Sequence, residues 1–274
     1  MTRFRGTTVV ILMLVLTLTG CAPRAAETPK VVAATIKPLA LIAQAVAGSE
    51  LTIEVLGSDA GTARSDAADL ASRSAVVLQT GTSIDSWADD LGPGTAHHVK
   101  LSDALGSGTA GGAWLSLGDS VDMARLIRDT LDALFPELKE GFDSRYATLV
   151  TQCSQADGRL KQLVWKGSTR AFVAADTTWA VAASDYGLRV VVQKPLASLD
   201  LASADAASMI TTWGAAEKTH VVVVNVAPGT GTSVGRPPNG LVICYLDPLG
   251  AGAGSDFVPW LEGQLTLLAS ALAK

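Results

Sequence analysis

The sequence predicts an α/β protein of two lobes, each a parallel sheet flanked by helices, joined by one long linking helix. In both halves of the chain, short apolar runs typical of buried strands alternate with stretches of helical periodicity. That alternation indicates parallel strands connected by crossover helices. Between the halves, apolar residues recur at helical spacing for about 28 residues, roughly 42 Å at 1.5 Å per residue. Such a helix is long enough to run along both lobes.

The N-terminal lobe is expected at 31–118. Its strands are short runs rich in Val, Ala, Ile and Leu, which fit buried positions in a parallel sheet. They are predicted at 31–35, 51–56 and 75–79, with an edge strand at 99–101 and helices at 39–47 and 67–72.

The middle segment, 119–166, is predicted to be helical. Two apolar stripes at steps of three and four residues support this: Val121, Ala124, Ile127, Leu131 and Leu134, then Phe142, Tyr146, Leu149, Cys153, Ala156, Leu160 and Leu163. Pro136 between them suits the first turn of the second helix. Gly158 is tolerated inside that helix at a cost of about 1 kcal/mol.

The C-terminal lobe, 167–274, repeats the strand–helix rhythm without any internal repeat in the sequence itself. Strands are predicted at 170–174, 189–192, 219–224 and 241–246, and helices at 178–186, 202–216 and 257–272. The segment 229–240 is rich in Gly and Pro and is expected to be a loop.

The first twenty residues have the features of an export signal. Arg3 and Arg5 precede an apolar run at 9–18, which is too short to span a membrane stably. The ending Leu18-Thr19-Gly20-Cys21 resembles a bacterial lipobox, which implies cleavage before Cys21 and its acylation. Residues 21–30 then form a tether at the outer face of the cell membrane. The alternative is an uncleaved membrane anchor.

Charge restricts the partners of the mature chain. Of 21 basic residues, Arg3 and Arg5 lie in the signal, so 19 basic residues remain against 26 acidic ones, a net charge of −7. An acidic surface argues against nucleic acid or anionic lipid as a partner.

Sequence motifs of enzymes are absent. The Gly-rich segments 106–112 and 229–233 lack the Lys-Ser/Thr ending of a phosphate loop, and there is no Gly-x-Ser-x-Gly or His-Glu-x-x-His. We therefore expect no catalytic activity.

Cys153 and Cys244 lie in apolar surroundings and are expected to be buried free thiols, with a disulfide as the alternative in an exported protein.

A set of short motifs resembles the metal-binding solute receptors of bacterial ABC importers, the zinc and manganese lipoprotein class. In this sequence they are 31–39 (VVAATIKPL), 75–81 (AVVLQTG), 84–87 (IDSW), 114–116 (WLS), 186–188 (YGL) and 246–250 (LDPLG). Their order and spacing carry the resemblance, which covers about residues 31–272. It implies the two-lobe fold with its linking helix and a metal ion held between the lobes.

The resemblance also implies four ligands: two His from the first lobe, a His or Glu from the second, and a late Asp. Most are missing here. The loop 57–66, where the first His is expected, holds Asp59, Arg64 and Asp66 instead, and Gly112 occupies the second position. The third and fourth positions are occupied by carboxylates, Asp176 and Asp247. His97, His98 and His220 lie away from these positions and are expected to be solvated or satisfied by neighbours.

Asp176 and Asp247 are therefore the candidate metal ligands, and each has a purely structural alternative. Asp176 is placed to cap a helix beginning near Thr178, and Asp247 to hold a turn before Pro248. Arg64 is a permanent cation that would repel a metal and attract an anion. Trp114 is a further cleft candidate; core packing is the alternative for it, as for Trp87 and Trp179.

These features lead to one main functional hypothesis. The chain is expected to be a monomeric, extracytoplasmic substrate-binding lipoprotein, anchored to the membrane through Cys21, that serves an ABC transporter permease. Its cargo would be a divalent metal ion, Zn or Mn, with weakened or altered binding. One alternative is a metal-free module for another solute, anionic in view of Arg64, or for a transporter partner protein. The other is a surface adhesion or scaffold lipoprotein.

Overall fold

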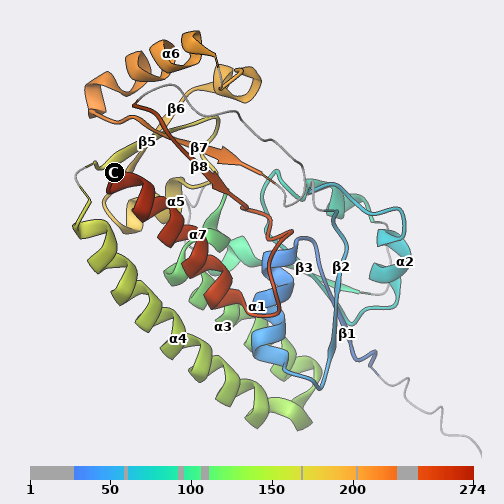
Figure 1. Cartoon of the computed structure of the whole chain (residues 1–274). Coiled ribbons are helices and arrows are strands. Elements are labelled where there is room, and N and C mark those ends of the chain that lie inside the picture. The colour runs from blue at the N-terminus through green and yellow to red at the C-terminus, as the bar shows by residue number, and fades with distance from the viewer. Residues whose placement is uncertain are drawn as a thin grey trace, which may run out of the picture.

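Two lobes, each built on a four-stranded parallel sheet, make up the molecule (Figure 1). The structure, a computed structural model, describes residues 28–58, 61–91, 96–105, 111–167, 169–201, 203–226 and 240–274. Within these ranges no helix combines the length and the apolar character needed to cross a membrane. The fold class predicted from the sequence is confirmed.

The N-terminal sheet has the strand order β2-β1-β3-β4, with every neighbouring pair parallel. Its strands are β1 (Val31–Ala34), β2 (Thr52–Val55), β3 (Val76–Gln79) and β4 (His97–Lys100), and its helices are α1 (Lys37–Ala47) and α2 (Ala67–Ser72). Helix α2 covers one face through a small cluster with Ala33, Leu56 and Val77. The other face joins the main core of the molecule.

The C-terminal sheet repeats this arrangement in the order β6-β5-β7-β8, again all parallel. Its elements are β5 (Ala171–Ala174), α5 (Ala180–Asp185), β6 (Arg189–Val192), α6 (Ala204–Gly214), β7 (Val221–Asn225), β8 (Val242–Leu246) and α7 (Phe257–Leu272). Helix α6 begins after Ser203, whose hydroxyl accepts a hydrogen bond from the Ala206 amide. The two lobes thus share one topology, although the sequence shows no repeat.

Helices α3 (Leu117–Leu134) and α4 (Lys139–Trp165) connect the lobes, and α4, with 27 residues, confirms the predicted linking helix. Figure 1 shows α4 running beside α7 along the molecule. One detail of its predicted stripe is wrong: Leu163 is 39% exposed and Val164 is buried instead. A straight helix has 3.6 residues per turn, so a stripe in steps of three and four drifts around it.

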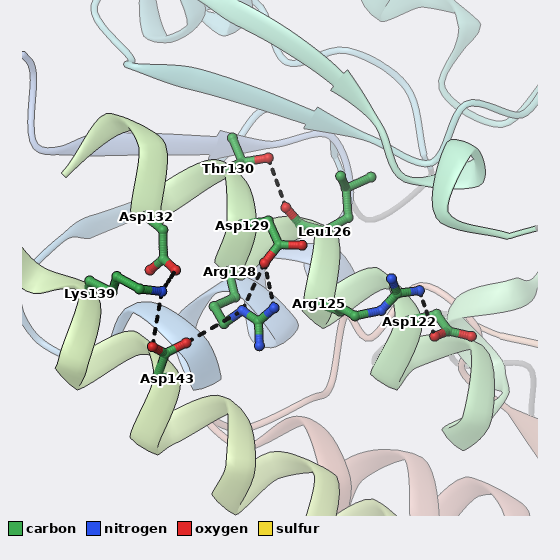
Figure 2. Close-up of polar contacts among 9 residues, drawn as sticks. All are labelled: Asp122, Arg125, Leu126, Arg128, Asp129, Thr130, Asp132, Lys139 and Asp143. Carbon is green, nitrogen blue, oxygen red and sulfur yellow. Dashed lines mark hydrogen bonds and ion pairs between the residues drawn. The ribbon is translucent and has the colours of Figure 1, made fainter. Parts of the chain in front are cut away.

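Charged side chains fix the corner between α3 and α4 (Figure 2). Lys139 contacts both Asp132 and Asp143, and Arg128 contacts Asp129 and Asp143. The Arg128 guanidinium also lies 4.6 Å from the centre of the Tyr146 ring. The corner therefore combines ion pairs with a cation–π contact.

Short 3-10 turns complete the connections, at Ser86–Asp90, Leu101–Ala104, Ala113–Leu115, Pro136–Leu138, Lys194–Ser198 and Ala215–Glu217. His97 and His98 lie inside β4 rather than before it, and His98 Nδ1 lies 3.1 Å from Gln79 Nε2. Cys153 and Cys244 are buried free thiols, as expected, and burial raises their pKa values to about 12 and about 11.

Candidate metal-binding cleft

The carboxyl ends of three parallel strands bring polar side chains to one edge of the C-terminal sheet. Asp176 follows β5, Asn225 ends β7 and Asp247 follows β8. Asn225 is paired in register with Leu246, so it lies beside the start of the Asp247 turn. In parallel α/β sheets this edge is where ligands bind. Sequence reasoning missed Asn225, although a polar residue closing the run Val221–Asn225 is a usable signal.

Asp176 is exposed, and both of its carboxylate oxygens already have partners. Oδ1 accepts a hydrogen bond from the Thr178 amide at 2.8 Å, and Oδ2 accepts one from Asn225 Nδ2 at 3.3 Å. Asn225 Oδ1 in turn accepts the indole N–H of Trp179 at 2.8 Å. Asp176 therefore holds the turn before α5, and a metal ion would have to replace the contact with Asn225.

Asp247 differs because one of its oxygens is both buried and unpaired. The residue is only 7% exposed. Its amide donates to Gln264 Oε1 at 2.7 Å, and Oδ2 accepts from the Gly252 amide at 2.9 Å. Oδ1 has no hydrogen-bond partner among the residues that the structure describes. A buried carboxylate oxygen without a donor is costly, and a bound cation would compensate it.

On the N-terminal side, Arg64 and Asp66 neutralise each other. Arg64 Nε and Nη2 donate to the two oxygens of Asp66 at 2.9 and 2.8 Å, on an exposed part of the loop. Their hydrogen bonds raise the pKa of Arg64 and lower the pKa of Asp66. Asp59 lies outside the described residues. The loop thus shows an internal ion pair and no uncompensated cation at position 64.

Gly112 occupies the position expected for the second His, and it has no room for a side chain. Its φ of +99° is in the left-handed region, and a Cβ atom built on it would lie 1.9 Å from the carbonyl oxygen of Thr178 in the other lobe. The backbones of the two lobes meet here. A ligand side chain at this position therefore requires the lobes to move apart.

Further direct contacts close the space between the lobes. Trp114 is 1% exposed, and its indole N–H donates to the Pro248 carbonyl at 2.7 Å, next to Asp247. Ser116 Oγ donates to Asp185 Oδ2 at 2.6 Å. Trp114 is thus packed in the core, and its indole N–H also joins the two lobes next to Asp247.

Another acid that sequence reasoning missed organises the facing edge of the N-terminal sheet. Asp85 is 2% exposed and accepts hydrogen bonds from Thr35 Oγ1 and the Thr80 amide, both at 2.5 Å, and from Thr80 Oγ1 at 2.6 Å. These bonds tie together the ends of β1 and β3. Asp85 has its donors within the lobe and serves the architecture of the cleft wall.

The side-chain atoms near the cleft that could bind a metal ion are oxygens. No set of three or more His, Cys, Asp or Glu side chains converges on one point in the described ranges. Asp247 and Asp176 are two carboxylates, with the Asn225 amide beside them. Such a set suits hard divalent ions more than Zn²⁺, which prefers imidazole and thiolate and takes at least three protein ligands.

The family model described as "Zinc-uptake complex component A periplasmic" (ZnuA) matches residues 32–271. The chain belongs to this family. The ZnuA family comprises metal-binding solute receptors of ABC importers, so the resemblance drawn from the short motifs is confirmed, and so is the broad role. Its members are substrate-binding proteins. No curated protein matches the chain by sequence.

Solved structures with the same fold include three whose sequences are distant. The Zn(II)-bound ZnuA-like domain of Streptococcus pneumoniae AdcA has a TM-score of 0.68 at 20% identity, covering 89% of this chain and 99% of that one. A Mn-bound periplasmic metal binding protein from Candidatus Liberibacter asiaticus has a TM-score of 0.71 at 18% identity, covering 88% and 99%. A mutant of the laminin-binding adhesin Lmb of Streptococcus agalactiae has 0.71 at 16%, covering 88% and 98%.

Within this family fold, the structure sorts the predicted site residues into three groups. Asp176 and Asp247 lie on the same sheet edge, where cargo is expected. Trp114 reaches that edge from the other lobe. Arg64 and Asp66 pair with each other at the surface of the first lobe. This ZnuA-family protein thus combines the family framework with direct contacts between the lobes at Gly112, Trp114 and Ser116.

Proposed function

We propose that this ZnuA-family protein is a lipid-anchored receptor that delivers a divalent metal ion to an ABC permease, using an altered site of oxygen donors. Asp247 would be the principal ligand. Asp176 would add a second carboxylate once it gives up its contact with Asn225 Nδ2 and the lobes separate enough to admit the ion. Manganese is the first candidate, because one structural neighbour is Mn-bound and because oxygen ligands suit Mn²⁺.

One observation carries this proposal. Asp247 Oδ1 is buried at the carboxyl edge of the sheet, beside the interlobe contact, and no described residue donates to it. Protein interiors rarely leave a carboxylate oxygen in that state, and a cation removes the cost. Two carboxylates are fewer ligands than a tight transition-metal site uses, so we expect weaker binding than in a His-liganded receptor.

Titration calorimetry of the chelator-treated protein with Mn²⁺ and Zn²⁺ tests the proposal. We expect saturable 1:1 binding of Mn²⁺ that weakens at least tenfold in Asp247→Asn and less in Asp176→Asn, whose oxygens are exposed. Asp69→Asn is the matched control, since Asp69 is exposed on α2 and forms a surface ion pair with Arg73. Absence of heat with both ions in the folded protein would reject metal delivery.

The anchor is a separate part of the proposal, supported by the signal and the sequence Leu18-Thr19-Gly20-Cys21. In the native host, the wild-type protein is expected in the membrane fraction, and Cys21→Ser in the soluble or uncleaved form. If the wild-type protein were released into detergent-free buffer after cell disruption, anchoring would be contradicted. The proposal of metal delivery would not be affected by that result.

A further inference from the structure

A cavity of about 450 Å³ lies beside the junction of the lobes, away from Asp176 and Asp247. Three helices form it: the start of α3, the middle of α4 and the end of α5. Its lining combines apolar side chains with four carboxylates: Leu117, Val121, Val150 and Cys153 on the apolar side, and Asp119, Asp122, Asp157 and Asp185 as the acids, with Lys161 as the one cation. That volume is typical of small-molecule sites.

Two of these acids, Asp119 and Asp185, form no ion pair within the described ranges, although Lys161 lies near enough to Asp185 for the carboxylate to raise the pKa of that lysine. Asp122 pairs with Arg125 at 3.1 Å, as Figure 2 shows, and Asp157 pairs with Lys161 at 2.7 Å. Asp185 is held by the Ser116 hydroxyl, a neutral donor. Asp119 pairs with no cation there, and the cavity therefore has an excess of negative charge.

A buried oxygen atom without a partner belongs to one of the lining acids. Asp119 Oδ2 is buried and receives no hydrogen bond from the described residues. Burial, with Asp185 and Asp122 nearby, raises the pKa of Asp119. The start of α3 contributes some positive potential to Asp119, but no donor reaches its Oδ2.

The cavity does not have the donor arrangement of a metal site. No three acidic, His or Cys side chains converge to hold an ion in the part of the chain described. Its apolar side includes Leu117 and Cys153, each 2% exposed. An apolar wall of this kind suits a hydrocarbon chain better than a metal ion. An ammonium or guanidinium group attached to a short carbon chain matches both halves of the lining.

We propose that this cavity binds a small organic cation, an amine or guanidinium on a short hydrocarbon chain. The charged group lies between Asp119 and Asp185, and the hydrocarbon lies on Leu117, Val121 and Cys153. Asp185 also bonds to Ser116, so a bound cation would contact the junction between the lobes. This site uses none of the proposed metal ligands.

Calorimetry of the full chain with putrescine and agmatine, at about 0.15 M salt to screen exposed charges, tests the proposal. We expect saturable binding of one molecule per chain and none of butane-1,4-diol, which has the same length without charge. Asp119→Asn and Asp185→Asn should each weaken binding at least tenfold, and Asp69→Asn should not.

A steric variant keeps the test independent of the carboxylates. Ser154 is exposed on α4 at the cavity, so Ser154→Trp should block it without disturbing the core. Ser144→Trp, exposed on the same helix but outside the cavity, is the matched control. Equal binding by both Trp variants, or no saturable binding to the folded wild type, would each overturn the proposal.

Discussion

At the scale of single residues, the backbone at position 112 leaves no room for a side chain. The family pattern expects a His here, whereas this chain has a Gly in the left-handed region whose Cα faces the Thr178 carbonyl. The loss of a ligand side chain could have left an open space. Here Thr178 of the other lobe fills that space, so a side chain at position 112 and the contact between the lobes cannot occur together.

Gly112→Ala should strongly destabilise the protein or separate the lobes. The new Cβ would clash with Thr178 O, and a positive φ costs a non-Gly residue about 1–3 kcal/mol in addition. Urea unfolding should show a loss of about 2 kcal/mol or more. Gly111→Ala is the control, because nothing lies within 4 Å of a Cβ there. Equal stability of the two variants would contradict the contact.

Asp119→Asn should stabilise the protein at pH 7. Because the pKa of Asp119 is raised in the fold from its ordinary value of 3.8, the folded state binds the proton more tightly than the unfolded state. Stability from this group is therefore present at low pH and is lost as the pH rises through the raised pKa. The gain in the variant should vanish below pH 3.8 in urea unfolding. A less stable variant at pH 7 would mean that the helix start stabilises the carboxylate.

At the scale of elements, α3 begins with a residue that has two functions. The Ser116 hydroxyl accepts the Asp119 amide at 3.1 Å as an N-cap and donates to Asp185 at 2.6 Å in the other lobe. The start of the helix is thereby coupled to the junction between the lobes.

Ser116→Ala should cost more than the loss of an ordinary cap. We expect about 2–3 kcal/mol, since a cap is worth about 1 kcal/mol and a hydrogen bond to a charged group about 1.5. Ser203→Ala, which removes a cap of α6 without an interlobe bond, is the control and should cost about 1 kcal/mol. Equal losses in chemical denaturation would show that the bond to Asp185 contributes nothing.

At the scale of the whole molecule, the lobes share a main core and touch at Gly112, Trp114 and Ser116. One stiff 27-residue helix runs between them. We therefore infer that cargo enters through small rotations of the lobes and not through a wide opening.

Small-angle scattering with and without Mn²⁺ should give nearly the same radius of gyration. Trp114→Phe, which removes the bond to Pro248, is expected to raise the Mn²⁺ association rate measured by stopped flow, because opening becomes easier. A large ligand-dependent change in scattering of the wild-type protein would contradict the stiff linkage.

Much of the architecture follows from local sequence. Apolar runs and helical stripes are properties of neighbouring residues, so they predict the strands, the crossover helices and the linking helix. Short motifs in the right order indicate the family. Gly112, where the motif resemblance leads us to expect a His, and the carboxylates at 176 and 247 can likewise be read from the sequence.

Only the tertiary structure decided how those positions are used. It turned Arg64 toward Asp66, gave both oxygens of Asp176 partners, and left one oxygen of Asp247 buried without a donor. It also set Gly112 against Thr178 and gathered Asp119 and Asp185 around one cavity. The physical reason is distance along the chain for the last two: Gly112 and Thr178, like Asp119 and Asp185, are 66 residues apart, and no local pattern encodes which backbone will fill which space.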